Sequence, residues 1–332
     1  MKGESGPPPP PPPPPVSLSR PLKLPASATD EDEDVLGAVA FRAARASLYH
    51  RLIIHLNETQ PIIQEGPTCG LAAATMALTQ LGRCGDDVTV TSLLQEARRA
   101  AMTAQGEMFS AADLARLAAG RLAPDGDPAT AGRVRSDLDR PEAVLRAVLR
   151  GDAVLVPYPF KREGYDADRN HAPCARGGAA AHWALVCGVL VGTVADADDP
   201  RETDTRPPTV DETVYPAPPQ LVSAAAARAD GLRPDRRELL LLCRQSKSRR
   251  LAVWRYGDLV VSNEQLRAAR PHRAGEQPYV LSQGSVEAGL CGQWVHLWRP
   301  DRGEGTHSLA EADSLADWIL GQKASDDGEA AV

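Results

Sequence analysis

The stretch Gln64-Glu65-Gly66-Pro67-Thr68-Cys69-Gly70-Leu71 decides how the rest of this sequence is interpreted. It places Cys69 where a proline-containing loop ends and an apolar helix is expected to begin. A thiol at a helix N-terminus faces unpaired backbone N–H groups and the positive end of the helix dipole, and both favour the thiolate. Gln64 carries an amide that can donate a hydrogen bond to an oxyanion beside that sulfur. With a histidine from elsewhere in the chain, these groups predict a cysteine-nucleophile hydrolase.

A second interpretation of Cys69 stays open, because a free cysteine is often a small buried hydrophobic residue at a helix start. Gly70 favours the nucleophile, since a glycine lets a substrate backbone approach the sulfur. The helix itself is predicted over Cys69–Leu81, and Gly82 is suited to end it. Its apolar residues share one face at helical spacing: Leu71, Ala74, Leu78 and Leu81.

The base is expected at His182, which opens an apolar strand beginning His182-Trp183-Ala184-Leu185-Val186. A histidine at a strand edge can point into a cleft while its strand stays buried. Its imidazole would hold the Cys69 thiolate as an ion pair and protonate the leaving amine. The alternative is a structural histidine with satisfied hydrogen bonds.

A third group should orient that imidazole, and the sequence offers several. Gln245, directly after a predicted strand, is the favoured one. Asn263 is the other neutral residue, although it can equally be a helix cap. The acidic alternatives lie in a segment predicted to be flexible: Asp196, Asp198 and Asp199.

A metal site competes for some of these residues. His171, Cys174, His182 and Cys187 are four metal-capable side chains within 17 residues, and zinc takes such ligands. The spacing is not that of a regular zinc finger. In a continuous strand Cys187 would face away from His182 and pack in the core. We therefore expect no metal, and we place His171 and Cys174 on a loop beside the cleft.

The segment Thr103–Ser110 joins two predicted helices and mixes polar with large apolar residues. It is either a turn with a helix cap or a wall of the substrate pocket. In the second case Gln105 or Glu107 would offer polar contacts.

The predicted elements run from helices to strands. Helical spacing covers residues 36–56, 69–81 and 92–102, and further helices open at Ser110 and at Pro141. Short apolar strands are predicted next, at 153–157 and 183–191. A hairpin of 239–243 with 251–256 follows, and 279–282 and 293–298 are the last predicted strands. This order predicts an α+β fold with an antiparallel sheet, the nucleophile lying on the leading helix.

Composition limits the function. The 332 residues are 42% apolar and carry a formal charge of −7, which argues against a nucleic-acid footprint. No apolar run approaches the roughly 18 residues of a membrane span. The proline-rich N-terminus does not resemble a secretory signal, so the six dispersed cysteines are expected to be reduced thiols of a cytoplasmic protein.

The chain is predicted to have one domain between two tails. Residues 1–34 form a disordered tail whose run Pro7–Pro15 would be a polyproline rod of about 28 Å. Such a rod is either a spacer or a ligand for an aromatic groove of the profilin or EVH1 type. The domain spans 35–300 with a flexible insertion at about 195–236, and 301–332 is an acidic tail in which a short helix can form.

Several separated segments together resemble the actin maturation protease family, which belongs to the papain-like cysteine peptidases related to bacteriocin-leader peptidases. The segments lie between about residues 50 and 300: Gln64–Leu71, Thr103–Asp113, His182–Gly188, 245–248, 262–266 and 288–292. Their joint match is more specific than any single motif.

The resemblance implies a papain-like fold and a cysteine aminopeptidase that removes an N-acetylated cysteine or methionine from immature actin. Cys69 matches the nucleophile, His182 the base and Gln64 the oxyanion-hole glutamine. Gln245 departs from the Asp or Asn usual at the orienting position. No cofactor is implied, and the proline run is expected to engage profilin. Another papain-like thiol hydrolase, deubiquitinase-like or transglutaminase-like, and a non-catalytic profilin- or actin-binding module remain the alternatives.

Overall fold

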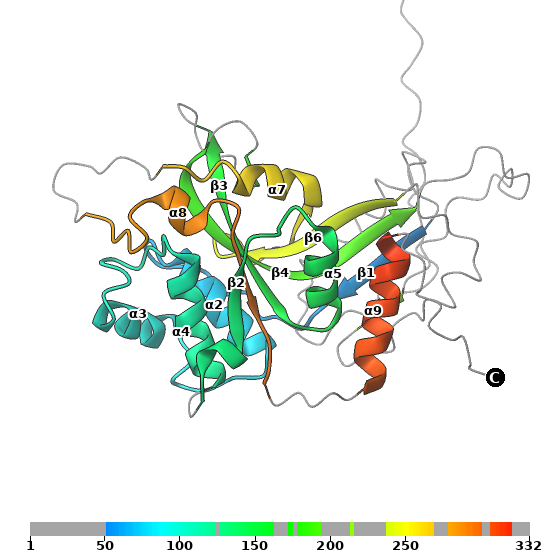
Figure 1. Ribbon diagram of the computed structural model, residues 1–332, viewed down its shortest axis with the longest axis horizontal. Helices are drawn as coiled ribbons and strands as arrows, with labels where there is room; N and C mark the ends of the chain where they lie inside the picture. Colours follow the sequence, from blue (N-terminus) through cyan, green and yellow to red (C-terminus); the bar gives the residue numbers. More distant parts are fainter. Residues whose placement is uncertain are drawn as a thin grey trace, which may run out of the picture.

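The structure is a computed structural model that describes residues 51–123, 126–162, 172–174, 178–193, 213–215, 237–268, 278–300 and 306–320 (Figure 1). It is an α+β fold built on an eight-stranded, mostly antiparallel sheet. The strands are β1 (Arg51–Leu56), β2 (Gly132–Arg135), β3 (Ala153–Arg162), β4 (Gly178–Thr193), β5 (Thr213–Tyr215), β6 (Arg237–Gln245), β7 (Ala252–Arg255) and β8 (Trp294–Leu297). The helices are α2 (Cys69–Gln80), α3 (Val90–Arg99), α4 (Ala111–Leu122), η1 (Pro128–Thr130), α5 (Pro141–Leu149), α7 (Tyr256–Asn263), α8 (Val286–Leu290) and α9 (Thr306–Leu320).

The long strand β4 organises the sheet. Its first half pairs with β3 and its second half with β1, while β6 runs along its other edge. The change of partner occurs at Gly188, where a β-bulge also shifts the register with β6. A Cβ at position 188 would lie 2.3 Å from the His55 carbonyl oxygen, so only glycine allows β1 to approach here.

Beyond this centre, the remaining strands extend the sheet in both directions. β8 pairs with β3, and β2 pairs with β8. On the other side β5 joins β1 in parallel, and β7 forms the expected hairpin with β6. The prediction of an α+β fold with an antiparallel sheet is confirmed, and the parallel β1–β5 pair is an addition to it.

One face of the sheet is covered by α2, α3 and α4, whose apolar residues share a core with Leu155, Trp183 and Leu185. The predicted limits of α2 are confirmed. The helix runs over Cys69–Gln80, and Gly82 follows it at φ +78°, a conformation that favours glycine.

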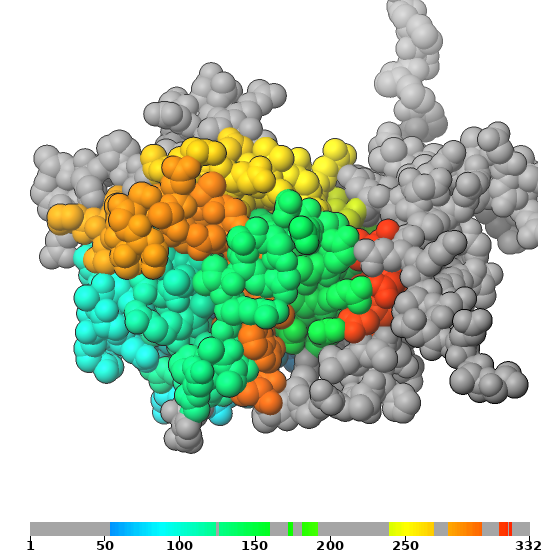
Figure 2. All heavy atoms as spheres, in the orientation of Figure 1, coloured from blue at the N-terminus to red at the C-terminus, as the bar shows by residue number. Residues whose placement is uncertain are grey.

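The other face is covered by α5 and α9, which lie side by side in green and red in Figure 2. α9 falls in the stretch that the sequence assigns to a tail. Its apolar residues nevertheless enter the second core: Ala312, Leu315, Ala316 and Ile319. Arg150, which directly follows α5, pairs with Asp313 of α9 at 2.8 Å, so charge also fixes α9 on α5.

Three sequence predictions are wrong. The last part of the predicted helix 36–56 is strand β1 instead, because Leu52 to Leu56 pair with β4 over their whole length. Long-range pairing overrides the local helical periodicity here. The helix predicted over 92–102 is α3, and it begins two residues earlier than predicted, because Thr89 is its N-cap and forms a capping box with Ser92. Residues 279–282 form no strand.

Some predictions lie outside the described residues, among them those for Pro7–Pro15, residues 36–50 and most of 195–236. Within the part that is described, no helix is long and apolar enough to cross a membrane. None of the six cysteines, all of which are described, forms a disulfide.

Candidate active site

Cys69 is the first residue of α2, and the start of this helix is uncapped. The Thr68 hydroxyl, which could cap it, donates instead to the Glu65 carbonyl at 2.8 Å. Backbone N–H groups at this end therefore remain available to an anion. The position of Cys69 agrees with the prediction, and the sulfur lies at a potential oxyanion site.

Gly70 has a different role from the expected one. A Cβ at this position would lie 2.9 Å from Cβ of Met108 and 3.0 Å from Cδ1 of Trp183. The glycine thus lets α2 pack directly onto the strand and onto the Thr103–Ser110 loop. It brings the sulfur to the sheet rather than leaving room for a substrate.

The Cys69 sulfur is held by backbone donors. Burial raises the pKa of this thiol, whereas the N–H groups of Trp183, Gly70 and Cys69 itself and the charge of Lys247 lower it. Burial is the larger effect, so the pKa stays above its ordinary value. The backbone donors at the helix end alone would favour the thiolate, but they do not offset the cost of burying it.

His182 lies on β4, directly before the residue whose N–H contacts the sulfur. Its side chain is buried and packs edge-on against Tyr158, its partner on β3, with ring centroids 5.6 Å apart. Burial raises the pKa of Tyr158, and the charges of Cys243 and Cys69 raise it further. Tyr158 therefore contacts the histidine, and its pKa also depends on the charge of the Cys69 sulfur.

Gln245 lies on the same side of the sheet as His182. It ends β6 and pairs with Ala184, two residues beyond the histidine, so Gln245 and His182 are diagonal neighbours on one face. The Gln245 side chain is buried, and its oxygen accepts a hydrogen bond from the Lys247 N–H at 2.9 Å. That oxygen has a second lone pair, which is what an orienting group needs.

Gln64 is fixed to the turn that follows Gln245. Its backbone N–H donates to the Ser246 carbonyl at 2.9 Å, and its side-chain oxygen accepts from the Ser246 hydroxyl at 2.8 Å. Its amide nitrogen donates to the Gly66 carbonyl. Gln64 therefore lies next to the turn that follows Gln245. One of its side-chain amide hydrogens points into the loop before Cys69.

The alternative third groups do not meet His182 in the same way. Asn263 ends α7 and donates its amide hydrogens to the carbonyls of Pro157 and Gln293, at 2.8 and 3.1 Å. It therefore connects α7, β3 and the loop before β8. Asp196, Asp198 and Asp199 lie outside the described residues.

The competing metal site is not assembled by the described residues, among which no three metal-capable side chains come together. Cys187 packs in the α2 core and donates to the Leu242 carbonyl at 3.3 Å, whereas His182 faces the opposite layer. His171 lies outside the described residues.

The Thr103–Ser110 loop packs against the site. The Trp183 indole N–H donates to the Met108 carbonyl at 2.9 Å. The buried Glu107 carboxylate accepts from the backbone N–H groups of Gln105 and Ala104, at 2.9 and 3.3 Å. Glu107 therefore stabilises its own loop, so its carboxylate is engaged there and not offered to a substrate.

All the segments that carried the resemblance meet around this site. Gln64 contacts the Ser246 turn, and Cys69 and Met108 contact Trp183. At the other end of the loop, Gly289 of α8 packs so closely on the Phe109 carbonyl that a Cβ would lie 2.1 Å from it. Residues far apart in the sequence thus form one connected structure.

The sequence of this chain is similar to those of known proteins. The sequence profile described as actin maturation protease-like, C-terminal domain, matches residues 59–190. The actin maturation protease of Mus musculus is 35% identical over 87% of this chain and 75% of its own length. The Bos taurus protein is 34% identical over 85% and 76%, and the Homo sapiens protein is 36% identical over 76% and 67%. The chain belongs to the actin maturation protease family.

The region matched by the profile of this actin maturation protease-like domain contains Cys69 and His182, whereas Gln245 and Asn263 lie beyond it. No solved structure matches the chain. The geometry adds two residues that the sequence did not suggest, Tyr158 and Lys247. Only the pairing of β3 with β4 reveals Tyr158, and only the turn after β6 reveals Lys247, so neither has a local sequence signal.

Proposed function

We propose that this chain is a papain-like cysteine aminopeptidase that removes the N-acetylated cysteine or methionine from immature actin. One observation carries the proposal. The Cys69 sulfur sits at the uncapped start of α2 and against the backbone of Trp183, the residue after His182. This arrangement occurs in a chain that is 35% identical to a protein named actin maturation protease.

The first step follows from the burial of the thiol. Burial raises the pKa of Cys69, so the resting thiol keeps its proton and a base has to take it during attack. We assign this role to His182, the neighbour of Trp183, so that the thiolate forms together with the imidazolium. The sulfur then attacks the carbonyl carbon of the first, acetylated residue. The Cys69 N–H and the second amide hydrogen of Gln64 stabilise the oxyanion.

The intermediate collapses when the C–N bond breaks. His182 gives its proton to the departing amine, which becomes the new N-terminus of the substrate. Water, deprotonated by His182, then attacks the thioester, releasing the acetylated amino acid and restoring the thiol. Gln245 orients the imidazole through its side-chain oxygen, and the reaction uses no metal or organic cofactor.

In this proposal the enzyme acts in the cytoplasm, on actin that is bound in a complex with profilin. We propose that Pro7–Pro15 engages profilin, because an uninterrupted proline run forms a polyproline rod that docks in aromatic grooves. Replacing these prolines with a Gly/Ser sequence should abolish binding to profilin. Unchanged binding would contradict this part of the proposal.

The activity is tested by mass spectrometry of immature actin incubated with the wild-type chain, Cys69→Ala and Cys84→Ala. Cys84 is exposed and serves as the matched control. Loss of one acetylated residue is expected with the wild type and Cys84→Ala but not with Cys69→Ala. An unchanged actin mass with folded wild-type protein would overturn the proposal and favour a non-catalytic binding module. Cleavage of ubiquitin conjugates or glutamine transfer instead would indicate another thiol hydrolase.

A further inference from the structure

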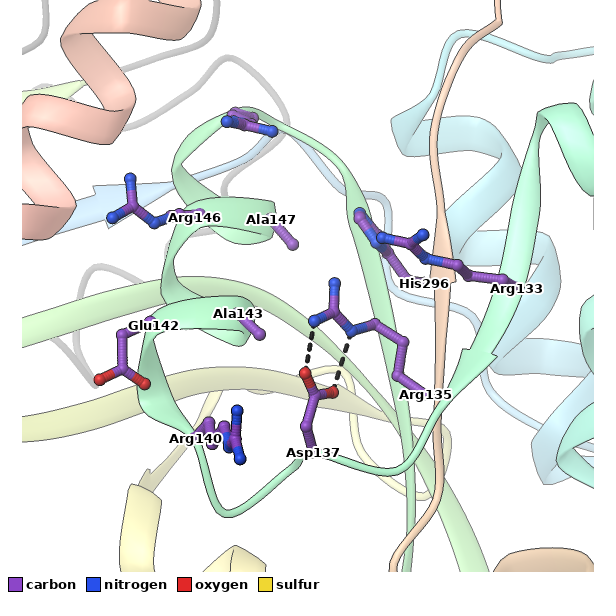
Figure 3. A pocket seen from close by; sticks show the side chains of 10 residues that line it. Arg133, Arg135, Asp137, Arg140, Glu142, Ala143, Arg146, Ala147 and His296 are labelled. Atoms are coloured by element: carbon purple, nitrogen blue, oxygen red, sulfur yellow. Dashed lines mark hydrogen bonds and ion pairs between the residues drawn. The ribbon is translucent and has the colours of Figure 1, made fainter.

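A basic cavity of about 610 Å³ lies between β2, β8 and α5 (Figure 3). It is on the sheet face covered by α5 and α9, whereas Cys69 lies on the face covered by α2. β2, α5 and the residues that flank α5 supply five arginines, and β8 supplies a histidine: Arg133, Arg135, Arg140, Arg146, Arg150 and His296. Two carboxylates, those of Asp137 and Glu142, also line the cavity. The chain has a net charge of −7, so this concentration of positive charge is local.

Two of the five guanidinium groups have no carboxylate partner among the described residues. Arg146 and Arg150 pair with aspartates of α9, and Arg135 pairs with Asp137. For Arg133 and Arg140, no carboxylate lies within ion-pair distance in the described part of the chain. Their charges are therefore available to a ligand.

The arginines of β2 are held in place by indole rings. The Arg133 guanidinium lies 5.6 Å from the Trp298 ring centroid, and that of Arg135 lies 5.1 Å from the Trp294 ring centroid. A guanidinium over an aromatic face is attracted by the ring, and its planar fork binds phosphate oxygens in pairs. These contacts orient the groups before any ligand arrives.

His296 gives an independent indication of a ligand. Its side chain is 90% buried and lines the cavity, and its Nε2 lies 2.9 Å from an Asp152 carboxylate oxygen. Its Nδ1 is buried and has no hydrogen-bond partner among the described residues. An unsatisfied buried polar atom is costly unless something binds it. With Nε2 held by Asp152, Nδ1 is the ring atom left to bind a ligand.

We infer that this cavity binds a small anion with at least two phosphate groups. The volume is in the range of about 300–1,000 Å³ that is typical of small-molecule sites, and a single phosphate would fill only part of it. Arg133 on β2 and Arg140 before α5 face the cavity from different elements (Figure 3), so one phosphate group can meet each of them. The ligand is a soluble diphosphate or a phosphorylated lipid headgroup. The inference is independent of the activity proposed at Cys69.

The test is titration calorimetry of the full chain with pyrophosphate, orthophosphate and, separately, vesicles of phosphatidylcholine with or without phosphatidylinositol bisphosphate. Saturable pyrophosphate binding that is at least about tenfold tighter than that of orthophosphate is expected. Arg133→Ala, Arg140→Ala and His296→Gln should each weaken it by about 10- to 100-fold. Arg99→Ala, an exposed arginine of α3, is the matched control and should bind as the wild type does.

Each outcome decides between the sources or against the site. Pyrophosphate binding that is lost in Arg133→Ala indicates a soluble ligand. Binding only to vesicles with the phosphorylated lipid, lost in the same variant, indicates a headgroup. Absence of both, binding that Arg133→Ala and Arg140→Ala leave unchanged, or an equal loss in Arg99→Ala would overturn the inference.

Discussion

The Ser246 hydroxyl donates a 2.8 Å hydrogen bond to the side-chain oxygen of Gln64, and the Ser246 carbonyl accepts the Gln64 N–H at 2.9 Å. This double contact joins the loop before α2 to the turn after β6. It fixes the carboxamide that we assign to the oxyanion. The turn that carries Gln245 therefore also positions Gln64, so both sides of the proposed catalytic centre depend on one serine.

Ser246→Ala should lower kcat more than it lowers stability. The loss of one hydrogen bond costs about 1 kcal/mol of unfolding free energy, but a misplaced donor loses much of its effect on the transition state. Gln64→Ala should lower kcat by about 10²–10³, the usual effect of removing an oxyanion donor. Steady-state kinetics on an acetylated actin N-terminal peptide measures both.

The control is Ser248→Ala in the same turn, whose hydroxyl accepts only from the Arg250 N–H among the contacts described for it. It should retain the wild-type kcat. Equal losses in the Ser246 and Ser248 variants would mean that the turn, and not the Gln64 contact, matters.

Lys247 should tune the reactivity of Cys69. Its charge lowers the pKa of the thiol, in opposition to burial. Lys247→Ala should therefore move the alkylation of Cys69 to higher pH, whereas Lys247→Arg should leave its pH profile nearly unchanged. Iodoacetamide labelling of Cys69, followed by peptide mass spectrometry across pH, measures the profile. A profile that is identical in Lys247→Ala and the wild type would contradict the electrostatic role.

The sequence predicted the parts of this fold that local signals determine. The start of α2 at Cys69 and its end before Gly82 follow from a loop proline, apolar spacing and a glycine. The start of α4 at its N-cap Ser110 and the start of α5 at Pro141 were likewise predictable. The hairpin of β6 and β7 was visible because a short polar turn separates two apolar runs.

Features that depend on distant partners were not predictable. Strand β1 has helical periodicity before it and becomes a strand only by pairing with β4. Cys69, His182, Gln64 and Gln245 stay predictions from the sequence, whereas the contact of Tyr158 with His182 was not predictable because it depends on the register of β3. The burial that raises the pKa of Cys69 comes from the tertiary packing of Gly70 on Trp183 and Met108.

Gly188→Ala should destabilise the fold strongly. The added Cβ would lie 2.3 Å from the His55 carbonyl oxygen, and backbone atoms cannot move away without separating β1 from β4. We expect a loss of about 3 kcal/mol or more in unfolding free energy, because overpacking of this kind is costly. Urea denaturation followed by circular dichroism provides the value.

Gly257→Ala is the matched control. It lies in α7, and a Cβ there meets no atom within 4 Å. This substitution should stabilise the protein by about 0.5–1 kcal/mol, since alanine is the better helix former. A comparable loss in both variants would show that the close approach at Gly188 is not the cause.

His55 should make the protein sensitive to acid. Its ring is buried in β1, with Nε2 3.1 Å from the Asn57 side-chain oxygen and 3.2 Å from the Val148 carbonyl. Burial lowers its pKa from 6.5 to about 4, because the charged imidazolium is poorly solvated there. The unfolded chain therefore takes up this proton first. The stability contributed by neutral His55 is fully present above pH 6.5 and is lost as the pH falls towards 4.

The expected loss from this one group is about 3 kcal/mol over that interval. His55→Gln cannot titrate, so its unfolding free energy should depend less on pH between 6.5 and 4 than that of the wild type, even if it is lower at neutral pH. Urea denaturation at several pH values gives both curves. Parallel curves would show that His55 does not drive the acid response, and the carboxylates that pair with Arg146 and Arg150 would then be the groups to replace next.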